Sequence, residues 1–248
     1  MKISIITAVF NCEATIADSI RSLQSQSYFN IEHVIIDGAS TDRTLSVIRD
    51  LLDPRSILIS EADSGIYDAL NKGIANSSGD IIGFLHADDI LENSNVVDKV
   101  ASIFADSKID AVYGDLVYVK SNDVGKVIRY WKSSSYDDDS FSRGWMPPHP
   151  TFYVRRSVYE RLGNFDTRYR ISSDYDCILR FLTKGNINAV YLPEVLVRMR
   201  VGGISNRSFK MIFLKTYEDF KILRGNSVGG IYSLICKNIR KLNQFWRV

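Results

Sequence analysis

The chain has 248 residues, of which 45% are hydrophobic and 24% charged, and its formal net charge is +2. This size and composition predict a folded chain with one large domain, or one domain and an appendage, and argue against disorder. The small total charge argues against a protein built mainly to hold nucleic acid. From Arg207 to Val248, however, nine Lys/Arg face two Asp/Glu, so an acidic body carries a basic tail.

Cysteine use and hydropathy indicate where the chain resides. Cys12, Cys177 and Cys236 are far apart and form no CxxC pair, which favours reduced thiols over disulfides or a thiolate metal site. The start "MKISIITAVFN" lacks a small-residue cleavage site and fits a first strand better than a signal peptide. No run reaches the roughly 18 apolar residues of a membrane span. We therefore expect a cytoplasmic protein, with the inner membrane face as its one alternative location.

Residues 1–107 alternate between strand and helix patterns. Apolar residues at helical spacing predict helices over 16–23, 41–52 and 66–75, between strands at "ISIITAVF", "EHVIID", "SILIS" and "DIIGFL". Strands separated by helices of this length form βαβ units and hence a parallel sheet covered on both faces. After residue 108, "DAVYGDLVYVKSNDVGKVIRYW" predicts a hairpin that adds antiparallel strands.

Two further segments complete the predicted architecture. Residues 133–150, "SSSYDDDSFSRGWMPPHP", are polar and then proline-rich, which is typical of a lid or binding loop. Apolar residues keep helical spacing over 209–220 and 231–245, which predicts two amphipathic helices. The predicted fold is α/β, with a mostly parallel, Rossmann-like central sheet, antiparallel additions and C-terminal amphipathic helices.

Polar residues end each predicted parallel strand, where ligands of open α/β sheets bind. Clustered carboxylates repel one another unless a cation or hydrogen-bond donors offset the repulsion, and oxygen ligands select Mg²⁺ or Mn²⁺ that bridges to phosphates. We therefore expect a metal-nucleotide in this crevice. The alternative is that each acid caps the following helix, as Asp42 could, which is less convincing for four consecutive ends. The strand-end residues are Thr7, Ala8 and Asn11, then Asp37, then Glu61 and Asp63, then His86, Asp88 and Asp89.

Seven ordered motifs carry a family resemblance: "ISIITAVFN", "IIDGASTDRT", "EADSGIYDALNKG", "GFLHADD", "VYGD", "RLGNFDTRY" and "SDYDCILR". From residue 3 to about 183 the chain resembles family-2 inverting glycosyltransferases of the GT-A fold, and "DSGIYDALNKG" with "GGIS" is similar to bacterial members that build surface polysaccharides. The resemblance implies a GT-A domain over 1–205, with a nucleotide-binding half (1–107), an acceptor-binding half (108–205) and a basic tail (206–248).

The resemblance also implies roles in donor binding. Asp88 matches the last acid of the family's DxD pattern and would be the principal metal ligand, with Asp89 a second ligand or a plain cap. His86 stands where many relatives have the first Asp, so it cannot supply that negative charge. Lys72 would add positive charge at the phosphates or be solvated. The implied donor-binding residues are Thr7, Ala8, Asn11, Asp37, Asp63, Lys72, His86, Ala87 and Arg200.

On the acceptor side, Asp174 falls where the family carries its general base, and the alternative is that it caps the following helix. The helix would point the side chain of Asp176 in a different direction from that of Asp174. His149 matches a family histidine that would contact metal or phosphate, or is structural. The aromatic residues Tyr136 and Trp145 would stack on a sugar or simply pack.

The expected activity is inverting transfer of a sugar from a nucleotide-sugar, with UDP as the expected nucleotide, to a glycan or lipid-linked hydroxyl. A nucleotidyltransferase is one alternative, but "AVFNCEAT" lacks the Gly-rich loop it needs. A non-enzymatic acidic-pocket module is another, and it leaves Asp174 and the 133–150 loop unexplained. The tail either packs on the body or on a second subunit, or it contacts an anionic membrane through basic and aromatic residues. Those residues are Lys237, Arg240, Lys241, Arg247, Phe245 and Trp246.

Overall fold

A computed structural model describes residues 1–202, 209–242 and 244. Its first half is a run of parallel strands joined by helices, as the alternating pattern predicts. Strand β1 pairs with β2 on one side and β4 on the other, with Ile3 opposite both Ile31 and Ile81, and β3 pairs with β2. The elements are β1 (Ile3–Val9), α1 (Ile16–Gln24), β2 (Ile31–Asp37), α2 (Thr44–Leu51), β3 (Ser56–Ser60), α3 (Ile66–Asn76) and β4 (Ile81–Phe84).

The second half continues the same sheet with mixed pairing. The predicted hairpin is confirmed, since β7 runs antiparallel to β6, while β8 is antiparallel to both β4 and β6. Strand β9 lies parallel to β6 and antiparallel to the short β5. The order along the sheet is β3-β2-β1-β4-β8-β6-β9-β5, with β7 also on β6. The elements are β5 (Ile90–Leu91), α4 (Val96–Ile103), β6 (Ala111–Lys120), β7 (Asp123–Trp131), a 3-10 turn (His149–Thr151), β8 (Tyr153–Arg155), α5 (Arg156–Leu162), α6 (Ser173–Thr183) and β9 (Ala189–Arg200).

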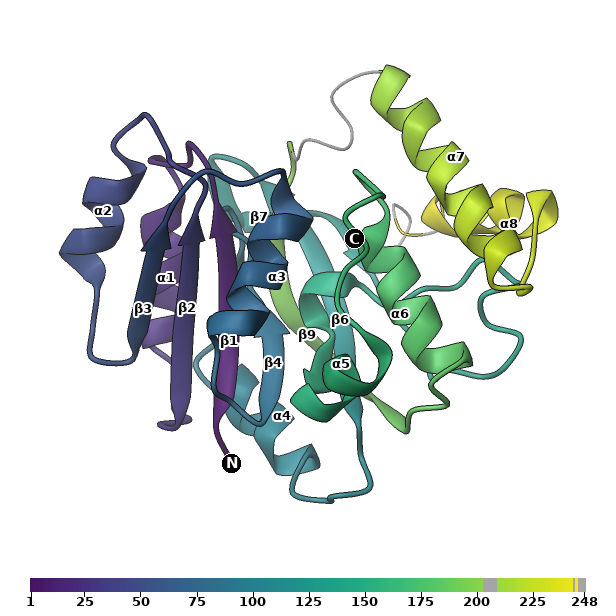
Figure 1. The fold of residues 1–248 in the computed structure, drawn as a ribbon, viewed down its shortest axis with the longest axis horizontal. Helices are drawn as coiled ribbons and strands as arrows, with labels where there is room; N and C mark the ends of the chain where they lie inside the picture. The colour runs from purple at the N-terminus through teal and green to yellow at the C-terminus, as the bar shows by residue number, and fades with distance from the viewer. Residues whose placement is uncertain (203–208, 243, 245–248) are drawn as a thin grey trace.

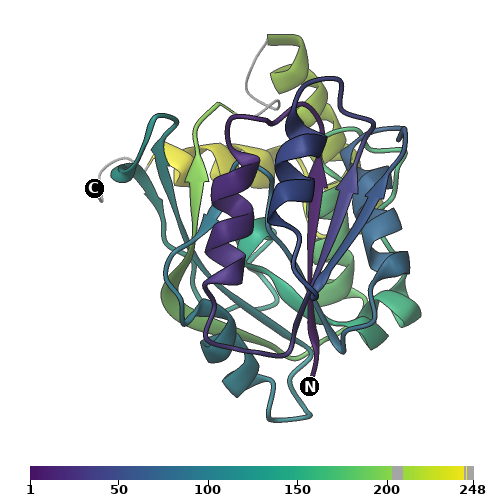
Figure 2. The same cartoon turned by 90° about the vertical axis from the view of Figure 1, so that its left-hand side faces the viewer.

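Helices cover both faces of the sheet and bury a core on each. Leu70 of α3, Val158 of α5 and Leu179 of α6 belong to one apolar cluster, and Leu23 of α1 and Val97 of α4 to another. Figures 1 and 2 show these helices on opposite sides of the strands. The predicted mostly parallel α/β architecture with antiparallel additions is confirmed.

Two C-terminal helices, α7 (Phe209–Gly225) and α8 (Ile231–Leu242), lie beside α6 at one end of the molecule (Figure 1). Both were predicted from apolar spacing. In the described part of the chain, no helix combines the length and apolarity that crossing a bilayer requires.

The 133–150 segment is more ordered than its polar composition predicts. Phe141 and Trp145 are buried, and the Tyr136 ring packs against both of them. Gly144 has φ +73°, and a Cβ on it would lie 2.2 Å from the backbone nitrogen of Lys237 in α8. An aromatic cluster and a close backbone contact therefore anchor a segment that we expected to be an open loop.

Candidate active site

Asp37 is fully buried where β2 ends. Its carboxylate accepts hydrogen bonds from the Ser40 backbone N–H and from the Ser60 hydroxyl, the latter at 2.7 Å. The parallel register that places Asp37 opposite Ser60 explains the second bond. Because its oxygens are used within the protein, Asp37 orders the loop after β2 in this structure and presents little surface to a ligand.

Thr7 and Asn11 support the end of β1. The Thr7 side chain has no exposed surface, and its hydroxyl lies 3.0 Å from Nε2 of His33 and donates to the Leu85 carbonyl at 2.8 Å. Asn11 adopts φ +49° and accepts a hydrogen bond from the Thr41 backbone N–H at 2.8 Å. Both were predicted to touch the nucleotide, and in this structure both side chains make hydrogen bonds within the protein at the carboxyl end of β1. Ala8 between them is half-buried.

Asp63 lies beside Gly38, the residue that follows Asp37. A Cβ placed on Gly38 would lie 2.4 Å from Oδ2 of Asp63, so the carboxylate occupies space that only a glycine leaves free. The Phe10 ring reaches within 3.6 Å of the same point and is 58% exposed. An exposed aromatic face beside a carboxylate can receive a base and accept a hydrogen bond from it. Sequence reasoning missed Phe10, although an aromatic directly after a buried strand was a usable signal.

Lys72 is engaged next to Asp63 rather than pointing freely into the crevice. Its Nζ donates to the Ala62 carbonyl at 2.9 Å and pairs with Glu61 at 2.8 Å and with Asp68 at 3.6 Å. Asp68 also accepts a hydrogen bond from the Ser64 backbone N–H at 3.0 Å. The lysine predicted to meet phosphate therefore holds the loop before α3 in this structure.

Arg200 of β9 makes hydrogen bonds to the "HADD" turn that follows β4. Asp89 is completely buried and accepts a hydrogen bond from the Arg200 backbone N–H at 3.3 Å. The Arg200 guanidinium donates to the Asp88 carbonyl at 2.9 Å and to Asp18 at 2.6 Å. Burial, with the Asp88 charge in a smaller part, holds the pKa of Asp89 well above its usual range. Arg200, predicted to bind the donor, holds this turn in the structure, and Asp88 is half-buried.

Two histidines bring the halves of the site together. The His86 and His149 ring centroids are 5.9 Å apart. Burial lowers the pKa of His149 to about 4 and also lowers that of His86, although the charges of Asp88 and Asp174 act on His86 in the opposite direction. Both imidazoles are therefore neutral at pH 7. Asp88 and Asp174 come from distant parts of the chain, and both lie close enough to act on one ring.

The donor set fits a metal ion only in part. The described residues contain no cluster of three or more His, Cys, Asp or Glu side chains placed to hold one. They do offer the half-buried Asp88 carboxylate, and Nε2 of His149 is buried without a hydrogen-bond partner among them. Mg²⁺ and Mn²⁺ sites of one or two protein ligands are completed by phosphates and water. These side chains fit an ion that arrives with a nucleotide and do not form a closed cage. Ala87, between His86 and Asp88, is buried.

Asp174 lies in the first turn of α6, whose N-cap is Ser172, so the cap alternative does not describe it. The Tyr67 hydroxyl of α3 lies 3.1 Å from Oδ1 of Asp174 and 2.6 Å from the Ile171 carbonyl. Asp176 points elsewhere: it is 3.5 Å from Nε of Arg180 and lines a separate polar depression. The expected divergence of the two acids is confirmed, and Tyr67, which was assigned no role from the sequence, contacts Asp174.

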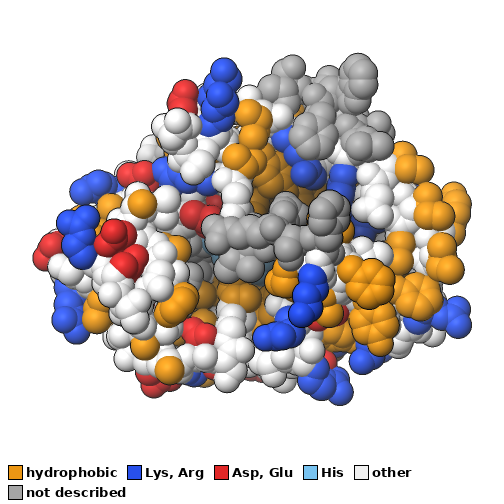
Figure 3. Space-filling model, turned by 90° about the horizontal axis from the view of Figure 1, so that it is seen from above, with side chains coloured by type: hydrophobic (Ala, Val, Ile, Leu, Met, Phe, Trp, Pro, Cys, Tyr) orange, Lys and Arg blue, Asp and Glu red, His pale blue; other side chains and the backbone are white. Residues whose placement is uncertain are grey.

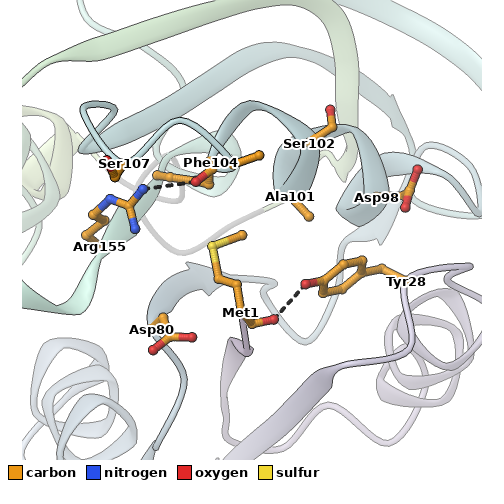
Figure 4. Close-up of a pocket in the computed structure, with 10 residues that line it drawn as sticks. Met1, Tyr28, Asp80, Asp98, Ala101, Ser102, Phe104, Ser107 and Arg155 are labelled. Carbon is orange, nitrogen blue, oxygen red and sulfur yellow. Dashed lines mark hydrogen bonds between the residues drawn. The ribbon is translucent and has the colours of Figure 1, made fainter.

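One surface depression lies at the other end of the sheet. It has a volume of about 570 Å³, and Met1, Tyr28, Asp80 and Arg155 are among its lining residues (Figure 4). The Tyr28 hydroxyl donates to the Met1 carbonyl at 2.6 Å. Met1 and Asp80 precede β1 and β4, so this depression is at the amino ends of the strands. Ligands of open α/β sheets bind at the opposite ends, where the acids and histidines gather.

This mixed sheet, with acids at its parallel strand ends and a carboxylate from the second half, defines the class of GT-A glycosyltransferases. The chain belongs to glycosyl transferase family 2, whose model matches residues 4–169. It is 30% identical over 217 residues to the "PGL/p-HBAD biosynthesis glycosyltransferase" of Mycobacterium bovis BCG, covering 86% of this chain and 82% of the relative. It is 29% identical over 206 residues to the "Putative glycosyltransferase EpsE" of Bacillus subtilis, covering 80% and 73%.

Solved structures share the fold at lower identity. Residues 1–349 of S. aureus TarS in complex with UDP match with a TM-score of 0.68 and 18% identity, over 98% of this chain and 70% of that one. The chain spans 39% of a longer TarS chain. The mannosyltransferase PcManGT of Pyrobaculum calidifontis, in complex with GDP-Man and Mn²⁺, matches with a TM-score of 0.63 and 18% identity, over 96% and 73%. The family makes the chain a glycosyltransferase rather than a nucleotidyltransferase or a binding module.

Proposed function

We propose that this glycosyltransferase moves one sugar, with inversion, from a UDP-sugar to a hydroxyl of a glycan or lipid-linked acceptor. The observation that carries the proposal is that His86, just after the end of β4, lies 5.9 Å from His149 between ring centroids and feels the charges of both Asp88 and Asp174. Asp88 would serve the diphosphate and Asp174 the acceptor, and both charges act on the His86 imidazole. A single displacement needs this division of roles, because the nucleophile and the leaving group take opposite faces of the anomeric carbon.

On the donor side, the exposed Phe10 ring would stack against the base, and Asp63 would accept a hydrogen bond from a base N–H or a ribose hydroxyl. Asp88, with His149, would hold a Mg²⁺ or Mn²⁺ ion. When bound, that ion neutralises charge on the leaving diphosphate. PcManGT in complex with Mn²⁺ supports this ion, and TarS in complex with UDP supports the nucleotide.

On the acceptor side, Asp174 would take the proton of the attacking hydroxyl. The acceptor oxygen then bonds to the anomeric carbon while the bond from that carbon to the diphosphate oxygen breaks, so the leaving group carries the electron pair away. The Tyr67 hydroxyl, 3.1 Å from Oδ1 of Asp174, would orient that carboxylate toward the acceptor. Tyr136, half-buried in the 133–150 segment, would border the acceptor, whereas the 5% exposed Trp145 supports it from within the core.

Two measurements on the full chain test the proposal. Calorimetric titration with UDP, GDP and dTDP, each with Mn²⁺, Mg²⁺ or a chelator, should give tightest binding for UDP with metal. Release of UDP from a panel of UDP-sugars should fall by about 10² to 10⁴ in Asp174→Asn, the range of general-base contributions. Nucleotide affinity should be unchanged in that variant.

Asp176→Asn is the matched control, because Asp176 is two positions further on the same helix and faces Arg180. It should retain turnover. Preference for GDP or dTDP would overturn the donor assignment while leaving the fold and base in place. Full turnover in Asp174→Asn would overturn the base assignment.

A further inference from the structure

Helix α7 buries Ile222 and Leu223 as an ordinary surface helix does, but it also buries acids and exposes aromatic side chains. It buries two acids, Glu218 and Asp219, which are 5% and 4% exposed, and turns Phe213 and Tyr217 outward at 76% and 56% exposure. Surface helices of globular proteins normally bury their apolar stripe and expose their charges. An exposed aromatic row on a helix that buries acids is typical of a surface that binds a protein or a membrane.

Helix α8 likewise exposes apolar side chains and buries polar ones. Ser233 and Lys237 face inward, while Ile231, Ile235 and Ile239 are 68%, 51% and 54% exposed, as is Tyr232 at 72%. Hydrophobic side chains accordingly gather over this end of the molecule, on the right-hand side of Figure 3. Lys237, which sequence reasoning assigned to a membrane contact, is turned away from this surface, and Phe245, Trp246 and Arg247 of the same prediction lie outside the described residues.

The inward polar groups explain why these helices cannot simply rotate to hide their apolar faces. The Glu218 carboxylate accepts hydrogen bonds from the backbone N–H groups of residues 170–172, at 2.9 to 3.0 Å. Lys237 donates to Asp219 at 2.8 Å, and its Nζ lies 3.4 Å from the Tyr175 ring centroid. Rotation would break these buried charged contacts, and removing one partner of such a pair is strongly destabilising. The outward apolar face is therefore fixed.

The charge of this surface distinguishes between a second copy of the chain and a lipid surface as its binding partner. The exposed charged residues of the described helices α7 and α8 are all basic: Lys210, Lys221, Arg224 and Arg240. Lys221 is four residues after Tyr217, hence on the same row of α7, and Arg240 follows Ile239. The two acids of residues 209–242 are both buried. A second copy packed face to face would bring like charges together, whereas an anionic lipid surface complements them.

We propose that the outer face of α7 and α8 docks on an anionic membrane surface, with its aromatic and aliphatic side chains in the headgroup region and its basic residues at lipid phosphates. Apolar burial together with attraction of Lys and Arg to anionic lipid is how interfacial helices bind. Gly144 of the 133–150 segment packs directly on α8, and Lys237 lies over Tyr175, the neighbour of Asp174. The docking face thus adjoins the acceptor side, but the inference rests on exposure and charge and not on the proposed reaction.

Flotation of the full chain with vesicles tests the proposal. The protein should float with mixed phosphatidylglycerol and phosphatidylcholine vesicles, and weakly with phosphatidylcholine alone. Phe213→Ser/Ile235→Ser should reduce partitioning by tenfold or more. Lys221→Gln/Arg224→Gln/Arg240→Gln should reduce it by about fivefold for each charge removed, with the wild-type effect screened by salt.

Phe29→Ser is the matched control, since Phe29 is 84% exposed and lies between α1 and β2, away from this face. It should float like the wild type. Every substituted residue is exposed, so circular dichroism should show unchanged folding. Absence of flotation with anionic vesicles, or equal flotation of the apolar variant, would overturn the proposal. A dimer in light scattering that the apolar variant dissociates, without flotation, would assign the face to a second copy instead.

Discussion

The Tyr67 hydroxyl lies 3.1 Å from Oδ1 of Asp174 and 2.6 Å from the carbonyl of Ile171, the residue that begins the approach to α6. A residue of the parallel half thereby holds the candidate base of the other half. Tyr67 is 8% exposed and packs against Phe165, so its hydroxyl position is fixed by the core. Side-chain orientation at Asp174 consequently depends on how well α3 and α6 pack.

Tyr67→Phe should lower kcat by about fivefold to tenfold, the effect of losing a positioning hydrogen bond of about 1 to 1.5 kcal/mol. The affinity for UDP should stay within twofold, because the phenol faces the acceptor side. Tyr153→Phe is the control, since the buried Tyr153 hydroxyl has no hydrogen-bond partner among the described residues. Steady-state kinetics of both variants test this prediction. Equal kcat values for Tyr67→Phe and Tyr153→Phe would show that the Tyr67 hydroxyl does not contribute to turnover.

Glu218→Gln should loosen the backbone before α6. The carboxylate accepts three N–H donors from residues 170–172, and charged hydrogen bonds of this kind contribute about 1 to 3 kcal/mol. We expect a lower melting temperature together with lower kcat, since residues 170–172 lead directly to Asp174. The exposed Glu160→Gln should change neither. Retained kcat despite lowered stability would make Glu218 purely structural.

Gly144→Ala should disrupt the contact between the 133–150 segment and α8. Its φ of +73° is costly for alanine, and the added Cβ would lie 2.2 Å from the Lys237 nitrogen, for a combined cost of about 2 to 4 kcal/mol. Gly225→Ala, at a helical glycine with no atom within 4 Å of the new Cβ, should be neutral or stabilising. Urea unfolding should give a clearly lower midpoint for Gly144→Ala than for Gly225→Ala. Similar midpoints would contradict the described packing.

Phe10→Ala should weaken UDP binding by about tenfold, from the loss of about 1 to 1.5 kcal/mol of aromatic stacking. The mutation leaves the core intact because the ring is 58% exposed. Phe29→Ala, another exposed phenylalanine remote from the crevice, should bind UDP like the wild type. Calorimetry gives both values. Unchanged affinity in Phe10→Ala would place the base elsewhere.

Acid should destabilise the fold partly through His33. Burial lowers the pKa of His33 from 6.5 to about 4, so the folded state disfavours the proton that the unfolded chain binds. The stability that this pKa difference gives the folded state is fully present above pH 6.5. As the pH falls toward 4, the free energy of unfolding decreases by up to about 3 kcal/mol. His33→Gln should flatten the dependence of unfolding free energy on pH between 6.5 and 4. Parallel slopes for wild type and variant in urea would contradict it.

Periodicity predicted much of the fold from the sequence. Alternating apolar runs located β1 to β4 and the β6–β7 hairpin, because strands buried on both faces and amphipathic helices leave strong local patterns. The strand ends also predicted a donor crevice, and this stays a prediction. The short β5 and β8 were not predicted, since two or three residues carry no periodicity and their pairing with β9 and β4 is set by tertiary contacts.

Residue roles were harder to predict than residue positions. Thr7, Lys72 and Arg200 are near the predicted crevice, but each side chain is occupied by a partner that is distant in sequence or in a neighbouring loop. A polar residue at a strand end can bind a ligand or brace the wall, and only the three-dimensional partners distinguish the two. Tyr67 and Phe10 show the reverse case, since the sequence assigned neither a role and they lie beside Asp174 and Asp63.

The pairing of β5 with β9 constrains how this enzyme can be re-engineered. Residues 90 and 91 precede position 107, yet they bond to residues 197 and 198 near the end of the catalytic body, and Arg198 pairs with Glu92 at 2.7 Å. A chimera that takes residues 1–107 from a relative with another donor would import a foreign edge strand. Crossovers that keep β5 and β9 from the same parent should give folded hybrids more often than a cut between the two halves.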